Sequence, residues 1–230
     1  GAIDYAIHGG IKPARIVVTD IDQARLDRAQ KLISVESAQK EGIELIYVNT
    51  KDLPDPVATL RDLNGGELFD DVFVFAPVRS LVEMADKLLG KDGCLNFFAG
   101  PTDPNFSANL NFYNVHYESH HLVGTSGGNT EDIRESLELM AKGLLRPEAM
   151  ITHVGGLNAV AQTTINLDKI PGGKKLIYTH KKLDLVAIAD FAERGKTDPF
   201  YAELARITEA HNGLWCKEAE DYLLQHAPEI

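Results

Sequence analysis

The stretch "RIVVTDIDQARLDRAQKL", Arg15–Leu32, decides the fold class of this chain. It opens with a largely apolar run that ends in Asp20, the pattern of a strand buried on both faces of a parallel sheet. A helix follows at once, with Asp22 as the expected N-cap and apolar residues from Leu26 to Ile33 along one face. The stretch therefore predicts a strand that passes directly into a helix, with an acidic side chain at the strand's carboxyl end.

Strand and helix patterns alternate on both sides of this stretch. A short helical segment precedes it and ends at Gly9-Gly10. Further strands are expected at 43–48, 71–77, 93–100, 120–128 and 172–180, and helices at 57–66, 80–90, 130–143 and 157–167. Strands that alternate with helices of this kind indicate βαβ units, and the right-handed crossover rule then predicts an open, doubly wound parallel sheet.

The pattern changes after Lys182. The segments 183–195, 198–213 and 214–230 are helical by periodicity, with no strand expected between them. We therefore expect a Rossmann-like α/β domain over residues 1–182 and an α-helical C-terminal extension over residues 183–230. The aromatic residues of the extension are expected to pack on the main body or on a partner subunit; they are Phe191, Phe200, Tyr201, Trp215 and Tyr222.

Composition excludes several classes of protein. The 230 residues are 44% hydrophobic and 25% charged, which is typical of a globular domain, and the formal net charge of −11 argues against a nucleic-acid partner. The two cysteines, Cys94 and Cys216, lack the CxxC spacing of a zinc site and give no disulfide framework. Neither a signal peptide nor an apolar run of about 20 residues is present, so we expect a soluble cytoplasmic protein with a small-molecule ligand and no membrane contact.

Asp20 is the first candidate for a binding role. In a dinucleotide-binding unit, an acidic residue at the end of the second strand accepts hydrogen bonds from the adenosine ribose hydroxyls, and its charge repels a 2′-phosphate. The alternative is that Asp20 caps the next helix, although Asp22 is better placed to do so. Asp20, with its neighbour Ile21, therefore predicts a site that prefers NAD to NADP.

Loops at the ends of the later strands are the other candidates, because ligands of open α/β sheets bind at the carboxyl ends of strands. Ala76, Gly100, Gly127 and Gly128 lie in these loops, where small residues let the backbone approach a flat ring. The alternative is that these glycines only end strands and start helices. The glycine loop G-x-G-x-x-G that should bind the pyrophosphate is missing, since Gly9-Gly10 follows a helix and not a strand.

The segments 17–32, 69–100, 120–145, 151–167 and 172–180 resemble, in sequence and in order, the cofactor-binding half of the medium-chain dehydrogenase/reductase superfamily. The branch they resemble is that of the zinc-dependent polyol and sugar-alcohol dehydrogenases. The resemblance implies that Asp20 and Ile21 hold the adenosine ribose. It implies that Ala76 and Val78 lie against the cofactor and that Gly100 and the backbone of Thr125 to Gly128 meet the nicotinamide.

The resemblance also implies a reaction, which is hydride transfer between NAD and an alcohol, polyol, sugar or sugar phosphate, with zinc polarising the substrate oxygen. The zinc ligands of that family belong to a preceding catalytic domain that this sequence lacks, so the fragment alone is expected to be inactive. We assign no metal ligand, because His120 and His121 should point to opposite faces and His153 and His180 stand singly. A homo-oligomer is expected, with an exposed strand edge at 175–179 available for two-fold pairing.

A missing first strand has a structural consequence. In the doubly wound order 3-2-1-4-5-6 the first strand lies between the strands that end here at Asp20 and near Ala76. Its absence should leave a gap of about 9 to 10 Å between unpaired edges. We therefore predict that these two strands do not pair directly and that another segment or chain fills the slot.

Three other functions remain open from the residues. A short-chain dehydrogenase needs Tyr-x-x-x-Lys on a helix, but Tyr47 with Lys51 and Tyr178 with Lys182 lie at strand ends. A Rossmann-like methyltransferase also keeps an acidic residue at the end of its second strand. A non-catalytic nucleotide-binding module is the third alternative.

Overall fold

The computed structural model describes all 230 residues. The α-helices are α1 (Ala2–His8), α2 (Gln23–Leu32), α3 (Val35–Lys40), α4 (Pro56–Leu63), α5 (Arg79–Leu88), α6 (Phe112–Tyr117), α7 (Thr130–Ala141), α8 (Val160–Ile165), α9 (Phe191–Arg194), α10 (Pro199–Ala210) and α11 (Lys217–His226). The strands are β1 (Arg15–Asp20), β2 (Glu44–Asn49), β3 (Phe69–Val74), β4 (Leu89–Phe97), β5 (His121–Gly124), β6 (Ile151–Gly156), β7 (Lys174–Tyr178) and β8 (Val186–Ala187). Short 3-10 helices lie at Pro147–Met150, Leu157–Ala159, Leu167–Lys169 and Ile188–Asp190.

The chain forms two compact units. The N-terminal unit is Ala6–Leu139, and the C-terminal unit combines Met140–Ile230 with Gly1–Tyr5. The boundary between these units lies at 139/140, whereas the sequence suggested a domain boundary at 182/183. No helix in the chain is both long and apolar enough to cross a membrane.

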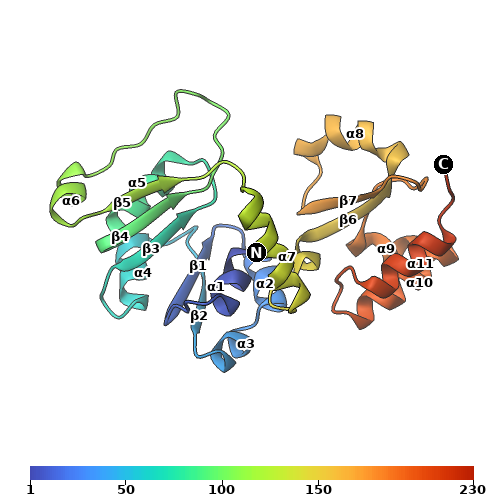
Figure 1. Ribbon diagram of the computed structural model, residues 1–230, viewed down its shortest axis with the longest axis horizontal. Helices are drawn as coiled ribbons and strands as arrows, with labels where there is room; N and C mark the ends of the chain where they lie inside the picture. The colour runs from blue at the N-terminus through green and yellow to red at the C-terminus, as the bar shows by residue number, and fades with distance from the viewer. The chain divides into compact units, whose positions relative to one another are not determined.

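The N-terminal unit contains two separate parallel sheets, one of β1 and β2 and one of β3, β4 and β5 (Figure 1). β1 and β3 do not pair with each other, so each has one edge without a strand partner. The predicted interruption between these two strands is confirmed. A Rossmann-like α/β fold that lacks its first strand explains why β1 and β3 are edges and why most of their residues are only partly buried.

The β1–β2 sheet is held by α2 and α3. Leu26 of α2 and Ala38 of α3 are buried with Leu45 of β2. The hydroxyl of Tyr47 donates a hydrogen bond to the backbone oxygen of Ile33 at 2.8 Å, at the end of α2, and burial raises its pKa to about 12. Burial of these side chains fixes α2 against the sheet and so fixes the turn between β1 and α2.

Helix α5 covers one face of the β3–β4–β5 sheet (Figure 1). Val74 of β3 and Leu95 of β4 form a core with Val82 and Ala85 of α5. The backbone N–H groups of Phe98 and Ala99 donate to the Val74 backbone oxygen at 3.1 and 3.0 Å, so the loop after β4 lies against the end of β3.

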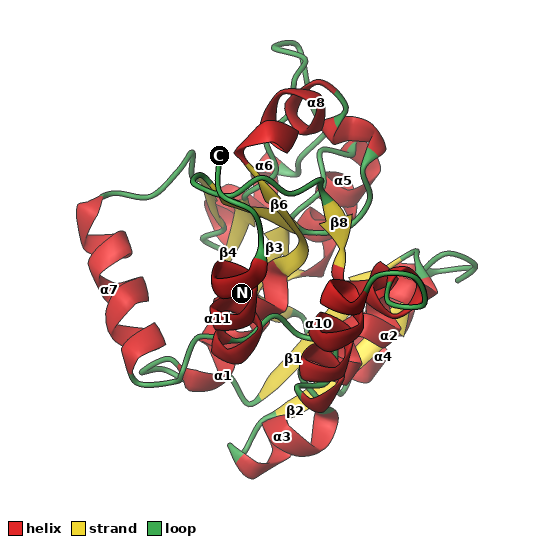
Figure 2. Ribbon diagram, turned by 90° about the vertical axis from the view of Figure 1, so that its right-hand side faces the viewer, coloured by secondary structure: helices red, strands yellow, loops and turns green.

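The C-terminal unit is built on a sheet with the strand order β7-β6-β8. β6 and β7 are parallel, and the two-residue strand β8 is antiparallel to β6. Helices α10 and α11 pack side by side in this unit (Figure 2). The expectation of a helix over 183–195 without any strand was wrong, because β8, a 3-10 turn and the four-residue helix α9 occupy that segment.

A shared core explains where the C-terminal unit begins. Val154 of β6 and Tyr178 of β7 belong to the same buried cluster as Phe191, Leu204 and Leu223 of the helices. The residues after 183 are mostly helical, as predicted, but they complete the core of β6 and β7. The strand β6 was not predicted, and with β7 it belongs to this unit and not to the sheets of the N-terminal unit.

His153 makes the stability of the C-terminal unit depend on pH. Its Nδ1 lies 2.9 Å from Thr152 Oγ1. Burial lowers the pKa of His153 and the charge of Lys175 lowers it further, while Asp190 acts in the opposite direction. The unfolded chain therefore takes up a proton on His153 at a higher pH than the folded unit does, and protonation favours unfolding.

We expect the free energy of unfolding of the wild type to fall between pH 7.5 and pH 5.5 by more than that of His153→Gln. Urea unfolding followed by the fluorescence of Trp215, the single tryptophan of the chain and a buried residue of this unit, measures both values. The difference between the two proteins isolates His153 from the other histidines. Equal losses in the two proteins would contradict the assignment.

Candidate functional site

The carboxylate of Asp20 lies at the carboxyl end of β1, beside Asn49 at the end of β2. Asp20 Oδ1 accepts the backbone N–H of Asp22 at 2.9 Å, and Oδ2 lies 3.8 Å from a guanidinium nitrogen of Arg25. Asp22 is the N-cap of α2 and accepts the backbone N–H of Ala24, as predicted. Asp20 is therefore free of the capping role, and its side chain stays 28% exposed.

This arrangement fixes Asp20 while leaving it able to accept further hydrogen bonds. A carboxylate offers about four acceptor positions, and the protein uses one of them for a close hydrogen bond, that from Asp22. Two vicinal hydroxyl groups are suitable donors for the rest. Ile21, the other residue predicted here, is exposed beside it.

Asn49 belongs to the same edge and was not predicted. Its Nδ2 donates to Gln23 Oε1 at 3.0 Å, and its Oδ1 accepts the backbone N–H of Lys51 at 3.0 Å. The first bond ties the end of β2 to the first turn of α2, and the second closes a local turn after β2. The parallel register that pairs Asp20 with Asn49 is the signal that identifies it.

The loop after β3 holds two predicted residues, Ala76 and Val78. The N–H of Val78 donates to the Ala76 backbone oxygen at 2.8 Å, which makes a tight turn around Pro77. Val78 is the N-cap of α5, and no side chain caps that helix end. Ala76 is half-buried and Val78 is exposed, so both are accessible at the carboxyl end of β3.

The other predicted glycines lie in the loops after β4 and β5. Gly100 is exposed, with no atom within 4 Å of the position a Cβ would take. Thr125 and Gly128 are exposed, and Gly127 has a φ of +73°, a conformation that favours glycine. These residues therefore flank the same edge of the β3–β4–β5 sheet, since its strands are parallel.

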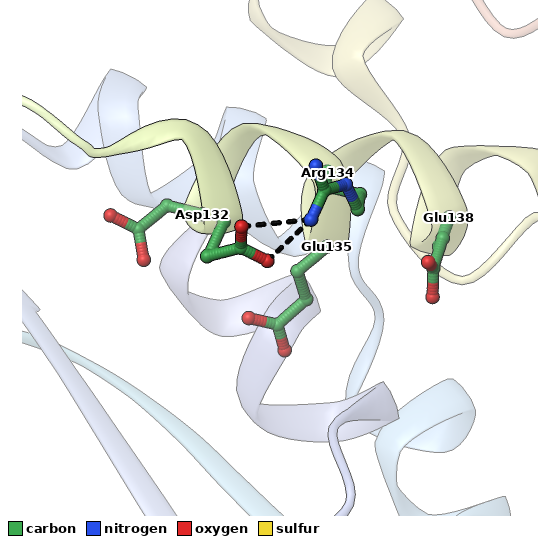
Figure 3. A pocket seen from close by; sticks show the side chains of 5 residues that line it. Asp132, Arg134, Glu135 and Glu138 are labelled. Carbon is green, nitrogen blue, oxygen red and sulfur yellow. Dashed lines mark hydrogen bonds and ion pairs between the residues drawn. The ribbon is translucent and has the colours of Figure 1, made fainter.

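Helix α7, which follows the β5 loop, begins with a reciprocal cap. Asn129 Oδ1 accepts the N–H groups of Glu131 and Asp132, and Asp132 Oδ2 accepts the N–H of Asn129 at 2.7 Å. The helix borders a shallow hollow lined by Glu131, Asp132, Arg134, Glu135 and Glu138 (Figure 3). Arg134 pairs with Glu131, so the hollow is acidic and a poor place for a dinucleotide's phosphates.

The structure contains no metal site. No group of three or more His, Cys, Asp or Glu residues is placed to hold a metal ion. His120 is buried, whereas His121 is exposed and lies 3.0 Å from Asp92. The two neighbours thus face different environments, as expected of adjacent strand residues. Cys94 and Cys216 are both free thiols.

Comparison with known proteins identifies the family. A family model described as zinc-binding dehydrogenase matches residues 1–142. The chain belongs to the zinc-binding dehydrogenase family. This confirms the resemblance to zinc-type medium-chain dehydrogenases.

Two curated relatives place the chain near the sugar-alcohol branch of the family. It is 58% identical over 98% of its length to mannitol-1-phosphate 5-dehydrogenase of Aliivibrio fischeri, and 45% identical over 100% of its length to L-sorbose 1-phosphate reductase of Klebsiella pneumoniae. The matches cover 53% and 52% of those proteins. The chain therefore spans about half the length of the curated relatives it matches.

A solved structure confirms the fold. A structure described as a short chain alcohol dehydrogenase of Escherichia coli CFT073, complexed with NADH, superposes with a TM-score of 0.55 at 14% sequence identity. The match covers 76% of this chain and 47% of that structure. At this identity the likeness concerns the fold alone.

Proposed function

We propose that residues 1–230 are the cofactor-binding part of a zinc-dependent, NAD-linked dehydrogenase that acts on an alcohol, a polyol or a sugar phosphate. The observation that carries the proposal is the Asp20 carboxylate, which is fixed at the carboxyl end of β1 and keeps acceptor capacity. The family, the names of the two sugar-phosphate relatives and the NADH-bound structural neighbour support it.

Asp20 fits the adenosine end of the cofactor. In the proposal its carboxylate accepts hydrogen bonds from the two ribose hydroxyls, and its negative charge disfavours a 2′-phosphate. NAD is therefore the cofactor we propose, in preference to NADP. Ile21 is exposed beside Asp20 and provides an apolar contact at this end of the site.

The loops after β3, β4 and β5 fit the nicotinamide end. These loops present small side chains and backbone atoms at one edge of the sheet. The residues are Ala76, Val78, Gly100, Thr125, Gly127 and Gly128. Such groups permit a flat ring to approach and keep water from it. NAD, when bound, accepts or supplies the hydride of the reaction.

Zinc, in this proposal, is held by residues outside these 230, since no ligand cluster lies within them. The fragment alone is then inactive, because zinc polarises the substrate oxygen in the family's chemistry. The partners we propose are a small alcohol or sugar substrate and further copies of the chain, with no nucleic acid and no membrane, in the cytoplasm. β7 is an edge strand, which offers a route to two-fold pairing.

Substitution of Asp20 tests the proposal in a protein that also carries the catalytic domain. We expect Asp20→Asn to weaken NAD binding by about 10- to 100-fold, the effect of one charged hydrogen bond, and to narrow the preference for NAD over NADP. Isothermal titration calorimetry with NAD, NADP and S-adenosylmethionine measures all three ligands.

Asp22→Asn is the matched control. It removes the same charge two residues away and keeps the helix cap, since asparagine caps as well as aspartate does. We expect less than a threefold change in NAD affinity. Equal effects of the two substitutions, or binding of S-adenosylmethionine in place of NAD, would overturn the proposal.

A further inference from the structure

The chain between Gly100 and α6 contains an extended segment that lies along helix α5. Residues 106–111 belong to no helix or strand, and we call them the strap. Phe106, Ala108 and Leu110 are partly buried against the core of Val74, Leu95 and α5, whereas the residues between them are exposed. This alternation is that of an extended chain with one side on the protein. Every second side chain of the strap therefore packs on the N-terminal unit.

The polar positions of the strap bind side chains of α5. Glu83 Oε1 accepts the backbone N–H of Asn109 at 3.0 Å and the side-chain Nδ2 of the same residue at 3.1 Å. Asp86, which is buried, accepts the backbone N–H of Asn111 at 3.0 Å. Residues 83 and 86 are three apart and so lie on one side of the helix. The two carboxylates hold the strap at two successive polar positions.

Side chains alone provide the polar anchors of the strap. Residues 107–110 make no hydrogen bond between backbone groups. A further contact, from the Arg79 guanidinium to the Ser107 hydroxyl, is longer at 3.4 Å. Hydrogen bonds to a carboxylate are stronger than those between neutral groups, and Glu83 receives two of them. Glu83 is therefore the main polar anchor in the middle of the strap.

The anchored strap fixes one end of the loop 100–105. At the other end of this loop, Ala99 is buried and its backbone N–H donates to the Val74 backbone oxygen at 3.0 Å. At the strap end, the ring of Phe106 stacks on that of Phe97, with the centroids 5.6 Å apart. A short loop between two fixed points has few conformations open to it, so its shape is set before a ligand binds.

We propose that Glu83 is a positioning residue: by holding the strap, it holds the loop 100–105 in the shape that receives the nicotinamide. The identity of this ligand rests on the proposed function, since the loop contains Gly100. Glu83 acts through the strap and not by contact with the cofactor. Helix α5 begins directly after the loop of Ala76 and Val78, so one helix positions the loops after both β3 and β4.

Hydrogen exchange tests the positioning without any cofactor. The amides of Asn105 and Phe106 both donate to Asp103 and make no bond to Glu83. Glu83→Ala should speed their exchange by about 5-fold or more, because the loop loses its anchor. Glu83→Gln keeps the acceptor oxygen and should leave the exchange within about twofold of the wild type. Lys87→Ala, an exposed position of the same helix, is the matched control and should change nothing. Far-UV circular dichroism checks that each variant is folded.

A substitution in the strap gives a second test of the same anchor. Asn109→Asp places a carboxylate against that of Glu83, and the repulsion should speed the exchange of the same two amides. Adding Glu83→Gln supplies an N–H donor to the new carboxylate, so the double variant should return to the wild-type exchange rates. Absence of this rescue would overturn the assignment of Glu83 as the anchor.

Ligand binding tests the role in the site, in a protein that also carries the catalytic domain. ADP-ribose has the adenosine end of NAD and lacks the nicotinamide. We expect Glu83→Ala to weaken NAD binding by about 10-fold and ADP-ribose binding by less than about twofold, because the loop must then be ordered on binding. Isothermal titration calorimetry measures both ligands.

Unchanged exchange in Glu83→Ala, or an equal loss of affinity for NAD and ADP-ribose, would overturn the proposal. A wild-type protein that does not bind NAD would overturn the proposed function, and the exchange rates would still decide whether Glu83 holds the loop. The two proposals therefore fail separately.

Discussion

A chimaera that supplies the central strand is expected to bind NAD at least 100-fold more tightly than residues 1–230 alone. In it, the N-terminal half of the Aliivibrio fischeri relative, which is 58% identical over the shared part, is joined to Gly1. The pyrophosphate of a dinucleotide binds at a glycine turn between a strand and a helix N-terminus, and no such turn precedes β1 in this chain. A 100-fold gain corresponds to about 2.7 kcal/mol. Calorimetry measures both dissociation constants.

The same chimaera with its glycine turn replaced by alanines is the control. Alanine side chains block the approach of the backbone to the phosphates but leave the added strand in place. We expect this control to gain stability, because β1 and β3 acquire a common neighbour, and to gain little NAD affinity. Tight NAD binding by residues 1–230 alone would show that the cofactor is held in another way.

Sequence patterns predicted the elements whose residues carry a clear local signal, such as an apolar run or a helix cap. The turn from β1 into α2 follows from an apolar run, the cap at Asp22 and a periodic helix, and the structure contains each of these. Helix α6 was missed inside an Asn- and Pro-rich connection, although Asn111 caps it by accepting the N–H of Tyr113. An asparagine followed by an aromatic run was the available signal.

β6 was missed because tertiary packing determines its sequence. The stretch "ITHVGG" ends in two glycines, which local rules interpret as a turn. A Cβ on Gly156 would lie 2.1 Å from the backbone oxygen of Lys181, so this glycine permits a close approach of two backbones. β8 has only two residues and exists through its pairing with His153 and Val154. Neither fact is visible in a window of ten residues.

The sequence predicted site residues that lie at the end of a single strand, but not those that neighbouring strands bring together. Asp20 was found because an acid at a strand's carboxyl end is a local feature. Asn49 was not, because only the register of β1 and β2 brings it beside Asp20. The interruption between β1 and β3 was predicted from the order of strands in the resembled family, and no local pattern in either strand indicates it. The geometry of the candidate site depends on which strands pair and in which register, and the periodicity of the sequence does not contain that information.

Removal of the Phe191 ring is expected to cause the largest loss of stability in the C-terminal unit. Phe191 is fully buried, with its ring centroid 5.9 Å from that of Tyr201 and 6.4 Å from that of Trp215. Phe191→Ala removes these contacts and leaves a cavity, which costs about 3 to 5 kcal/mol. Urea unfolding followed by Trp215 fluorescence measures the loss.

Ile165→Ala is the control for Phe191→Ala, because Ile165 belongs to the same unit and is largely exposed. We expect its effect to stay within about 0.5 kcal/mol. The size of the Phe191 effect also tests whether the C-terminal helices complete the core of β6 and β7. If they do, Phe191→Ala should speed the exchange of amide protons in β6 as well as in the helices, since Val154 shares its cluster. Exchange that changes only in the helices would mean that the residues after 183 form a separate appendage.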